Sequence, residues 1–162
     1  MHEMPRTLKV VTVWLLLGTA LFLAVQAWLA QRDRARFQID GMGTVTLKRA
    51  ADGHFHWPGR VNGRPLEFLV DTGATRTALP GALAQQLRLE RGRELRSSTA
   101  GGVVLGYEAR VDLQLEGGFV VRELRVTVLP DLAAPLLGMD VLSRLRFSQQ
   151  QGTLRLEPAH NP

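Results

Sequence analysis

The segment at residues 66–75, Leu-Glu-Phe-Leu-Val-Asp-Thr-Gly-Ala-Thr, constrains the fold more than any other part of the sequence. Its apolar run at 68–70 predicts a buried strand, and Asp71 follows that run directly. A carboxylate at the end of a buried strand loses solvation, so neighbouring groups must stabilise its charge. Thr72 supplies a hydroxyl for hydrogen bonding, and Gly73 allows a close backbone approach. We therefore expect a catalytic carboxylate on a rigid loop, although Asp-x-Gly also occurs in ordinary turns.

Composition favours one folded domain with a tail. The chain has 162 residues, of which 45% are hydrophobic and 22% charged, so a packed core is possible. The absence of cysteine excludes disulfides, thiolate metal sites and cysteine nucleophiles. The net charge of +5 is spread along the chain, and aromatic residues make up only 6%. A nucleic-acid partner is not expected, because it would favour a clustered basic face with aromatics.

Short strands separated by turn residues predict an all-β domain. The Asn62-Gly63 pair between strands at 53–61 and 64–70 predicts a hairpin whose second strand leads into Asp71. Further strands are expected at 44–48, 94–100, 103–115, 119–129, 134–137 and 154–156, with short helices at 79–87 and 139–145. Many short strands and few helices indicate a closed or partly closed β-barrel.

The uncharged stretch at residues 10–30 predicts a transmembrane helix. About 20 helical residues, each rising about 1.5 Å, span the roughly 30 Å of a bilayer core. Trp14 and Trp28 lie near its ends, where amphipathic rings prefer the interface. A cleaved signal peptide, with a weak cleavage site at 25–27, and a helix buried in a soluble core are the alternatives.

The predicted domain order follows from this helix. It consists of a tail at 1–9, a transmembrane helix at 10–30, a linker at 31–51, a folded domain at 52–158 and a tail at 159–162. Basic residues flank the helix on both sides, namely Arg6 and Lys9 before it and Arg32, Arg34 and Arg36 after it. The positive-inside rule therefore does not decide the orientation.

Five segments, in this order, resemble the retropepsin-like aspartic proteases, and most closely the bacterial single-domain, membrane-anchored members. They are Gly53-His54-Phe55, Val61 to Pro65, Phe68 to Thr75, Thr99 to Gly102, and Leu136 to Leu142. Asp-Thr-Gly alone is a weak signal, but Asp-Thr-Gly-Ala-Thr followed by Leu-Leu-Gly-x-x-x-Leu is specific. The resemblance implies a small closed β-barrel with one catalytic Asp-Thr-Gly per chain.

The resemblance also implies roles for individual residues. Asp71 would be the catalytic carboxylate, supported by its loop neighbours Thr72, Gly73, Ala74 and Thr75. Thr72 would bond to the equivalent loop of a second chain. A hairpin at 100–107 would form a flap over the substrate, with Ala100, Gly101, Gly102 and Val103 in contact with it. An apolar strand made by Leu136, Leu137 and Gly138 would pack beside the catalytic loop.

A single signature implies a dimer, because this chemistry needs two carboxylates. The other candidate aspartates, Asp40, Asp52, Asp112, Asp131 and Asp140, are not followed by Ser/Thr-Gly. We therefore expect a homodimeric, membrane-anchored aspartic endopeptidase without a cofactor, acting on protein or peptide substrates. Its partners would include the lipid bilayer through 10–30, and its domain would lie on the periplasmic side of a bacterial inner membrane. The alternative is a peptide-binding module on the same fold that does not cleave.

Two further patterns have simpler explanations. His54 and His56 share a strand face with Asp52, but a metal site needs further converging ligands, so a solvated edge strand is favoured. The arginines at 91, 93 and 96 are interpreted as a solvated face.

The apolar residues at 103–105 predict an apolar substrate cleft.

Overall fold

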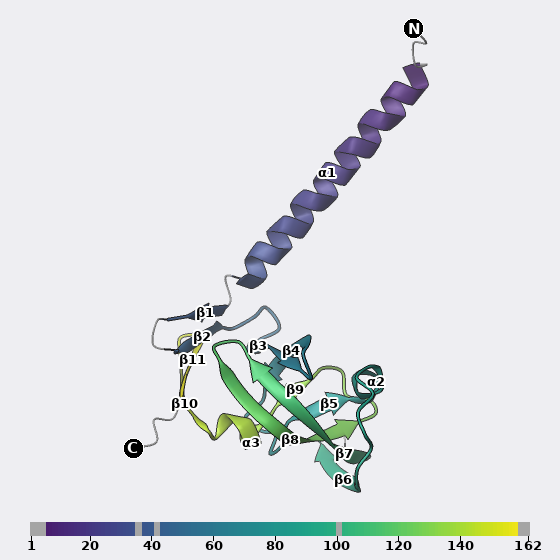
Figure 1. Cartoon of the computed structure of the whole chain (residues 1–162). Helices are drawn as coiled ribbons and strands as arrows, with labels where there is room; N and C mark the ends of the chain where they lie inside the picture. The colour runs from purple at the N-terminus through teal and green to yellow at the C-terminus, as the bar shows by residue number, and fades with distance from the viewer. Residues whose placement is uncertain (1–5, 35–36, 41–42, 100–101, 159–162) are drawn as a thin grey trace. The chain divides into compact units, whose positions relative to one another are not determined.

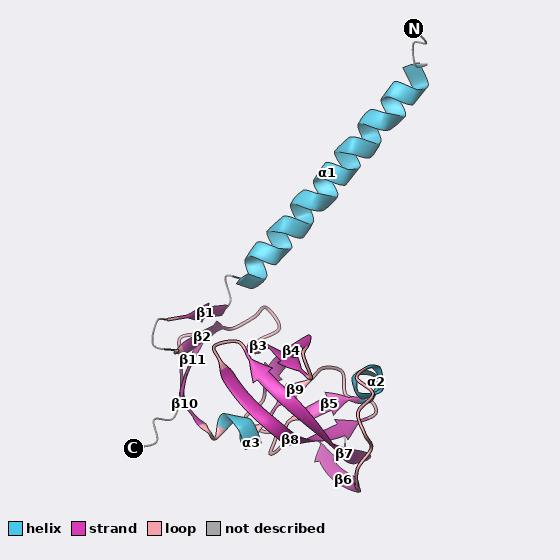
Figure 2. Cartoon of the chain, in the orientation of Figure 1, coloured by secondary structure: helices cyan, strands magenta, loops and turns pink. Residues whose placement is uncertain are grey.

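The computed structural model describes residues 6–34, 37–40, 43–99 and 102–158 (Figure 1). The chain divides into two compact units, Met1–Arg36 and Phe37–Pro162. The first unit contains a single helix, and the second is built mainly from strands (Figure 2).

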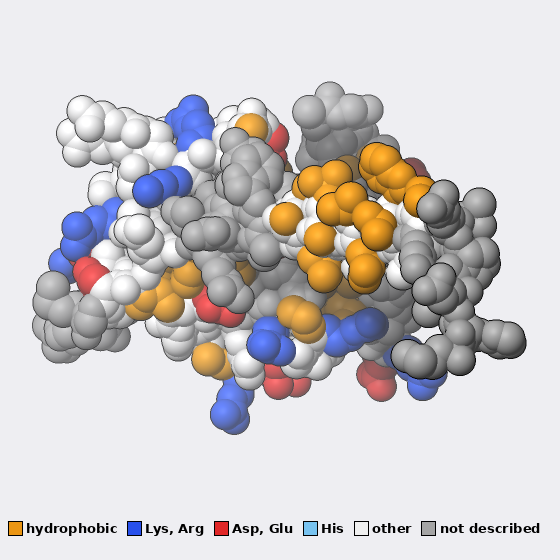
Figure 3. All heavy atoms as spheres, turned by 90° about the horizontal axis from the view of Figure 1, so that it is seen from above, with side chains coloured by type: hydrophobic (Ala, Val, Ile, Leu, Met, Phe, Trp, Pro, Cys, Tyr) orange, Lys and Arg blue, Asp and Glu red, His pale blue; other side chains and the backbone are white. Residues whose placement is uncertain are grey.

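Helix α1 (Arg6–Arg34) exposes its apolar side chains. Trp14, Leu21 and Phe22 are 69%, 67% and 62% exposed, and hydrophobic side chains gather there in Figure 3. Among the residues that the structure describes, no helix has both the length and the apolar character needed to cross a membrane. The predicted transmembrane helix at 10–30 is therefore not supported.

A four-stranded antiparallel sheet opens the second unit. Its order is β1 (Phe37–Ile39), β2 (Val45–Lys48), β11 (Thr153–Pro158) and β10 (Leu145–Gln150). Val45, Leu47, Leu154 and Leu156 are buried by this sheet. Residues 45–48 form the strand expected at 44–48, and it pairs with β11. Residues 37–39 form a strand that was not predicted, inside the stretch assigned to the linker, and it is held by main-chain pairing with β2.

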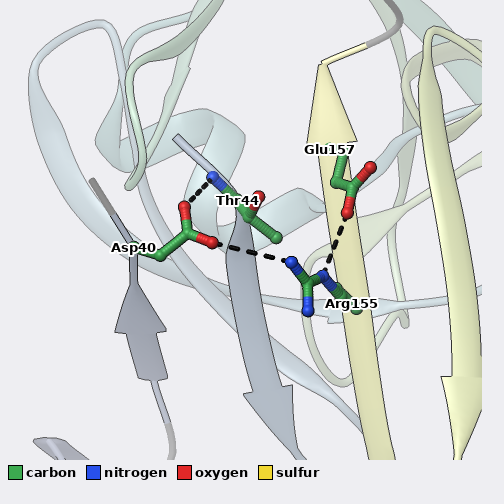
Figure 4. A network of polar contacts seen from close by, with 4 residues as sticks. All are labelled: Asp40, Thr44, Arg155 and Glu157. Carbon is green, nitrogen blue, oxygen red and sulfur yellow. Dashed lines mark hydrogen bonds and ion pairs between the residues drawn. The ribbon is translucent and has the colours of Figure 1, made fainter. Parts of the chain in front are cut away.

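A polar network joins the segment after β1 to β11. The Asp40 carboxylate accepts a hydrogen bond from the Thr44 N–H at 2.9 Å and lies 3.7 Å from a guanidinium nitrogen of Arg155. Arg155 also donates to Glu157 at 3.0 Å (Figure 4). These contacts connect segments that lie at opposite ends of the second unit's sequence.

The second sheet closes into a barrel, as predicted. Its seven strands lie in the order β3-β4-β9-β5-β8-β7-β6, and an additional β3–β7 pairing closes the ring. They are β3 (His56–Val61), β4 (Arg64–Val70), β5 (Ala78–Pro80), β6 (Glu94–Thr99), β7 (Gly102–Leu115), β8 (Phe119–Leu129) and β9 (Leu136–Leu137). Gly59 permits the closure, because a Cβ there would lie 2.7 Å from the Gln114 carbonyl oxygen.

The predicted hairpin between β3 and β4 is confirmed. Asn62 and Gly63 have φ values of 48° and 81°, which a two-residue turn of the primed type requires. Large side chains fill the barrel, including the fully buried Trp57 and Phe68. The Trp57 indole N–H donates to the Glu116 carbonyl at 2.8 Å, so burial leaves this polar group satisfied.

The helices are shorter than predicted. Helix α2 (Gly81–Gln86) begins after Pro80, because residues 78–80 pair with β8 as strand β5. Helix α3 (Met139–Leu142) ends before Leu145, which starts β10. The sequence did not predict β10, since all its side chains after Leu145 are exposed and carry no alternating apolar pattern.

Candidate active site

Strand β4 delivers the catalytic loop to a fixed place. Leu69 and Val70 pair in parallel with Leu136 and Leu137 of β9. The Asp71 N–H continues this ladder by donating to the Leu137 carbonyl at 3.0 Å. The predicted apolar strand beside the catalytic loop is therefore present, and it fixes the backbone of Asp71.

The loop at 71–75 orients the Asp71 carboxylate. The Gly73 N–H donates to its Oδ1 at 2.9 Å, and the Ala74 N–H donates to the Asp71 carbonyl at 3.3 Å. Asp71 is half-buried, whereas Thr72 and Gly73 are exposed. The Gly73 donor fixes the orientation of the carboxylate, which stays partly accessible to a ligand.

Gly138 and the first residues of helix α3 pack against the catalytic loop. The Met139 N–H donates to the Ala74 carbonyl at 2.8 Å, and the Asp140 N–H donates to the Thr75 carbonyl at 3.2 Å. A Cβ on Gly138 would lie 2.4 Å from the Arg76 carbonyl carbon. Glycine is therefore required at 138 because two backbone segments touch there.

Thr77 and Asp140 connect these two segments, and the sequence analysis assigned neither residue to the site. The N–H and hydroxyl of Thr77 donate to Asp140 Oδ1 at 2.9 and 2.8 Å. The Gly138 N–H donates to the Thr77 hydroxyl oxygen at 3.2 Å, and Thr77 is only 1% exposed. One feature of the sequence could have indicated this pair. Asp140 lies between apolar residues, and a carboxylate that is shielded from water needs hydrogen-bond partners.

Asp71 opens onto a cavity of about 790 Å³. Its lining includes residues of the catalytic loop, of β6 and the segment just before it, and of β8. The lining comprises Asp71, Gly73, Ala74, Thr75, Arg76, Ala78, Arg93, Leu95, Arg96, Ser97, Ser98, Thr127, Leu129, Leu132 and Leu136. Asp71 is the one carboxylate among these described lining residues.

The cavity is more basic than predicted. Arg76 donates to Glu108 at 2.7 Å, and Arg93 lies 3.9 Å from the same carboxylate. The hydrogen bond from Arg76, together with the nearby positive charges, lowers the pKa of Glu108 below its ordinary value. The predicted apolar cleft is present in part. Leu95, Leu129 and Leu132 contribute apolar lining, but Val103 and Leu105, from which it was predicted, are each 68% exposed and do not line this cavity.

The predicted flap hairpin is described in part. Strands β6 and β7 pair along Glu94–Thr99 and Gly102–Tyr107, with Gly102 and Val103 exposed. The predicted flap residues Ala100 and Gly101 lie outside the described residues. Contact of these residues with a substrate stays a prediction.

Thr72 lies beside a separate apolar cavity of about 170 Å³. Its lining comprises Phe55, Val70, Thr72, Leu142, Phe147, Gln149, Leu154 and Leu156. Within the described part of its own chain, the Thr72 hydroxyl has no hydrogen-bond partner. This side chain is therefore free to bond outside its own chain.

The two histidines lie away from this chemistry. His56 Nε2 contacts Asp52 Oδ2 at 2.7 Å. The His54 N–H also bonds to Asp52, and this bond is the main reason why the pKa of Asp52 is lowered. The pair lines none of the cavities described above.

The sequence and the fold are similar to known aspartic proteases. The gag-polyprotein putative aspartyl protease family matches residues 57–144, which is more than half of the chain. The crystal structure of a retropepsin-like aspartic protease from Rickettsia conorii matches with a TM-score of 0.55 and 28% identity. This match covers 70% of the present chain and 89% of that protein.

The EIAV protease, solved in complex with the inhibitor HBY-793, is 28% identical over 54% of this chain and 84% of its own, with a TM-score of 0.46. No curated protein matches the sequence significantly. The family match covers the barrel strands, the Asp71 loop and Gly138. The chain therefore belongs to the retropepsin-like aspartic proteases.

Proposed function

We propose that the chain is an aspartic endopeptidase that is active as a homodimer, with one Asp71 from each chain. The observation that carries this proposal is the position of Asp71, a single carboxylate facing a cavity of about 790 Å³. Family membership supports peptidase activity in general. The mechanism, however, needs a second carboxylate, and a second copy of the chain is the direct source.

The paired carboxylates would share one proton. Two carboxylates a few ångströms apart cannot both ionise, so one is protonated and the other is not. The ionised Asp71 takes a proton from water as the water oxygen attacks the peptide carbonyl carbon, and the protonated Asp71 donates a hydrogen bond to the carbonyl oxygen. Transfer of a proton to the amide nitrogen then releases the amine as the C–N bond breaks. The pair titrates as a unit with two apparent pKa values.

Features of the surface near Thr72 support the dimer. The Thr72 hydroxyl is free within the described part of its chain, and apolar residues surround the adjacent cavity. Strand β10 is an edge of the four-stranded sheet, and its Phe147 is 40% exposed. An exposed edge strand beside an apolar cavity offers main-chain hydrogen bonds and apolar area to a second copy.

Peptide cleavage tests the proposal. Full-length wild type should cleave a mixed peptide library and should be inhibited by a pepstatin-type compound. Asp71→Asn should reduce kcat by at least about a thousandfold, because both general-acid and general-base roles depend on this residue. Asp71→Asn with unchanged cleavage would contradict the assignment. A wild-type protein that binds peptides but cleaves none would favour the non-cleaving peptide-binding module.

The cellular location stays a prediction from the sequence. The sequence analysis favours a bacterial inner membrane with the protease domain on the periplasmic side. Fractionation and protease access in intact cells would test it. Digestion of residues 37–158 only after the inner membrane is opened would contradict the periplasmic placement.

A further inference from the structure

We propose that the cleft beside Asp71 selects peptides with an acidic side chain near the scissile bond, and that Arg93 and Arg96 bind this side chain. The inference rests on the proposed function and names its substrate class. It starts from an imbalance of charge in the cavity lining. Three arginines, Arg76, Arg93 and Arg96, line the cavity, whereas Asp71 is the one carboxylate among its described lining residues.

One neighbouring carboxylate is shared between two of these arginines. Glu108 accepts the Arg76 hydrogen bond at 2.7 Å, and its other oxygen lies 3.9 Å from an Arg93 nitrogen. A carboxylate neutralises one positive charge, so the Arg76–Glu108–Arg93 group retains a net positive charge. The weaker contact is that of Arg93, whose side chain is 77% exposed.

The unused donors favour a carboxylate ligand. A guanidinium carries five N–H donors in a planar fork that matches the two oxygens of a carboxylate. Arg93 makes only a long contact with Glu108, at 3.9 Å, and Arg96 makes no ion pair within the described ranges. A peptide in the cleft would therefore meet free arginine donors from β6 and the segment just before it.

The positive charge extends beyond the catalytic cavity. Arg93 also lines a second cavity, of about 720 Å³, together with Arg88, Arg91, Arg110 and Arg125. The carboxylates in this lining are Glu90, Glu108 and Glu123, so arginines outnumber them. An excess of positive over negative groups makes the electrostatic potential there positive, and this potential attracts negative charge. An acidic peptide would thus be favoured on approach as well as in the cleft.

Matched peptides test the inference. Each pair shares one apolar scissile sequence and differs only in a flanking Glu or Gln. With the full-length chain, kcat/KM should be about tenfold higher for the Glu peptide, because a charge-assisted bond replaces a neutral one. The ratio should decrease as salt is raised, since exposed arginines are screened.

Charge-neutralising variants assign the selectivity to these residues. Arg93→Gln should lower the Glu-to-Gln ratio to about twofold or less, and Arg96→Gln should lower it too. Arg122→Gln is the matched control, because Arg122 is exposed and lines neither basic cavity. This control removes the same charge and should leave the ratio unchanged. An equal kcat/KM for the two wild-type peptides, or an unchanged ratio in Arg93→Gln, would overturn the inference.

A binding measurement separates this inference from the proposed function. Fluorescence polarisation with reduced-amide versions of both peptides reports Kd without cleavage. Tighter binding of the Glu peptide by wild type, lost in Arg93→Gln, supports the inference even if no peptide is cleaved, in which case the proposed function fails. Equal cleavage and equal Kd for both peptides support the proposed function and overturn the acidic selectivity.

Discussion

The two sides of the cleft are built differently. On the catalytic-loop side, backbone bonds join residues 71–75 to β9 and α3, and Thr77 and Asp140 connect these segments beneath. At β6 and the segment just before it, the exposed side chains of Arg93 and Arg96 line the cavity, and Arg93 shares the Glu108 carboxylate with Arg76, which follows the catalytic loop. The difference indicates that one side fixes the catalytic geometry, whereas the other can change its side chains without disturbing the fold.

The largest effect on folding should come from removing the Asp140 carboxylate. Asp140→Ala leaves the N–H and hydroxyl of the buried Thr77 without their acceptor, so the free energy of unfolding should fall by about 1–3 kcal/mol. Asp140→Asn keeps an oxygen acceptor, so its free energy of unfolding should fall by less than that of Asp140→Ala. Urea denaturation of both variants measures these free energies. Equal stability of Asp140→Ala and wild type would show that the Thr77–Asp140 bonds do not make the catalytic-loop side more rigid than the β6 side.

A smaller effect is expected at Thr72. Thr72→Val keeps the shape but removes the hydroxyl, so the dimer should lose about 1 kcal/mol, which is roughly a fivefold increase in its Kd. Thr72→Ser keeps the hydroxyl and serves as the control. Analytical ultracentrifugation over a concentration series measures both. A dimer of Thr72→Val as tight as wild type would show that this hydroxyl makes no bond across the interface.

The smallest effect should come from Glu108. Its pKa is lowered from the ordinary value of 4.5, mainly by the Arg76 hydrogen bond. The ionised form therefore stabilises the fold above about pH 4.5, and this contribution is lost as the pH falls through the lower folded-state pKa. Glu108→Gln should be slightly less stable than wild type at neutral pH, and the two should converge in acid. Thermal unfolding of both proteins across pH measures the difference in stability between them. A difference that stays constant at all pH values would contradict the ion pair.

The sequence predicted the parts of the fold that have strong local signals. Asn62-Gly63 identified the β3–β4 hairpin, and alternating residues identified β7 and β8. Strand β10 carried no such signal, because it is an exposed edge strand held by main-chain pairing with β11. The sequence placed Asp71 at the end of a strand, as the structure shows, but of the apolar run at 68–70 only Phe68 is fully buried.

What escaped prediction depends on contacts between distant residues. Thr77 and Asp140 are far apart in sequence and meet only because β4 and β9 pair in parallel. Similarly, Arg93 was interpreted as part of a solvated face. The fold brings it to the catalytic cavity and to Glu108.

Mixing wild type with Asp71→Asn tests the central claim, that one active site needs Asp71 from two chains. Both proteins are first shown to dimerise equally, and they are then mixed at equal amounts and allowed to exchange. Random pairing leaves about a quarter of the dimers with two aspartates, so cleavage per total chain should fall to about a quarter of the wild-type value. A fall to about one half, as expected if each wild-type chain cleaves independently, would contradict the claim.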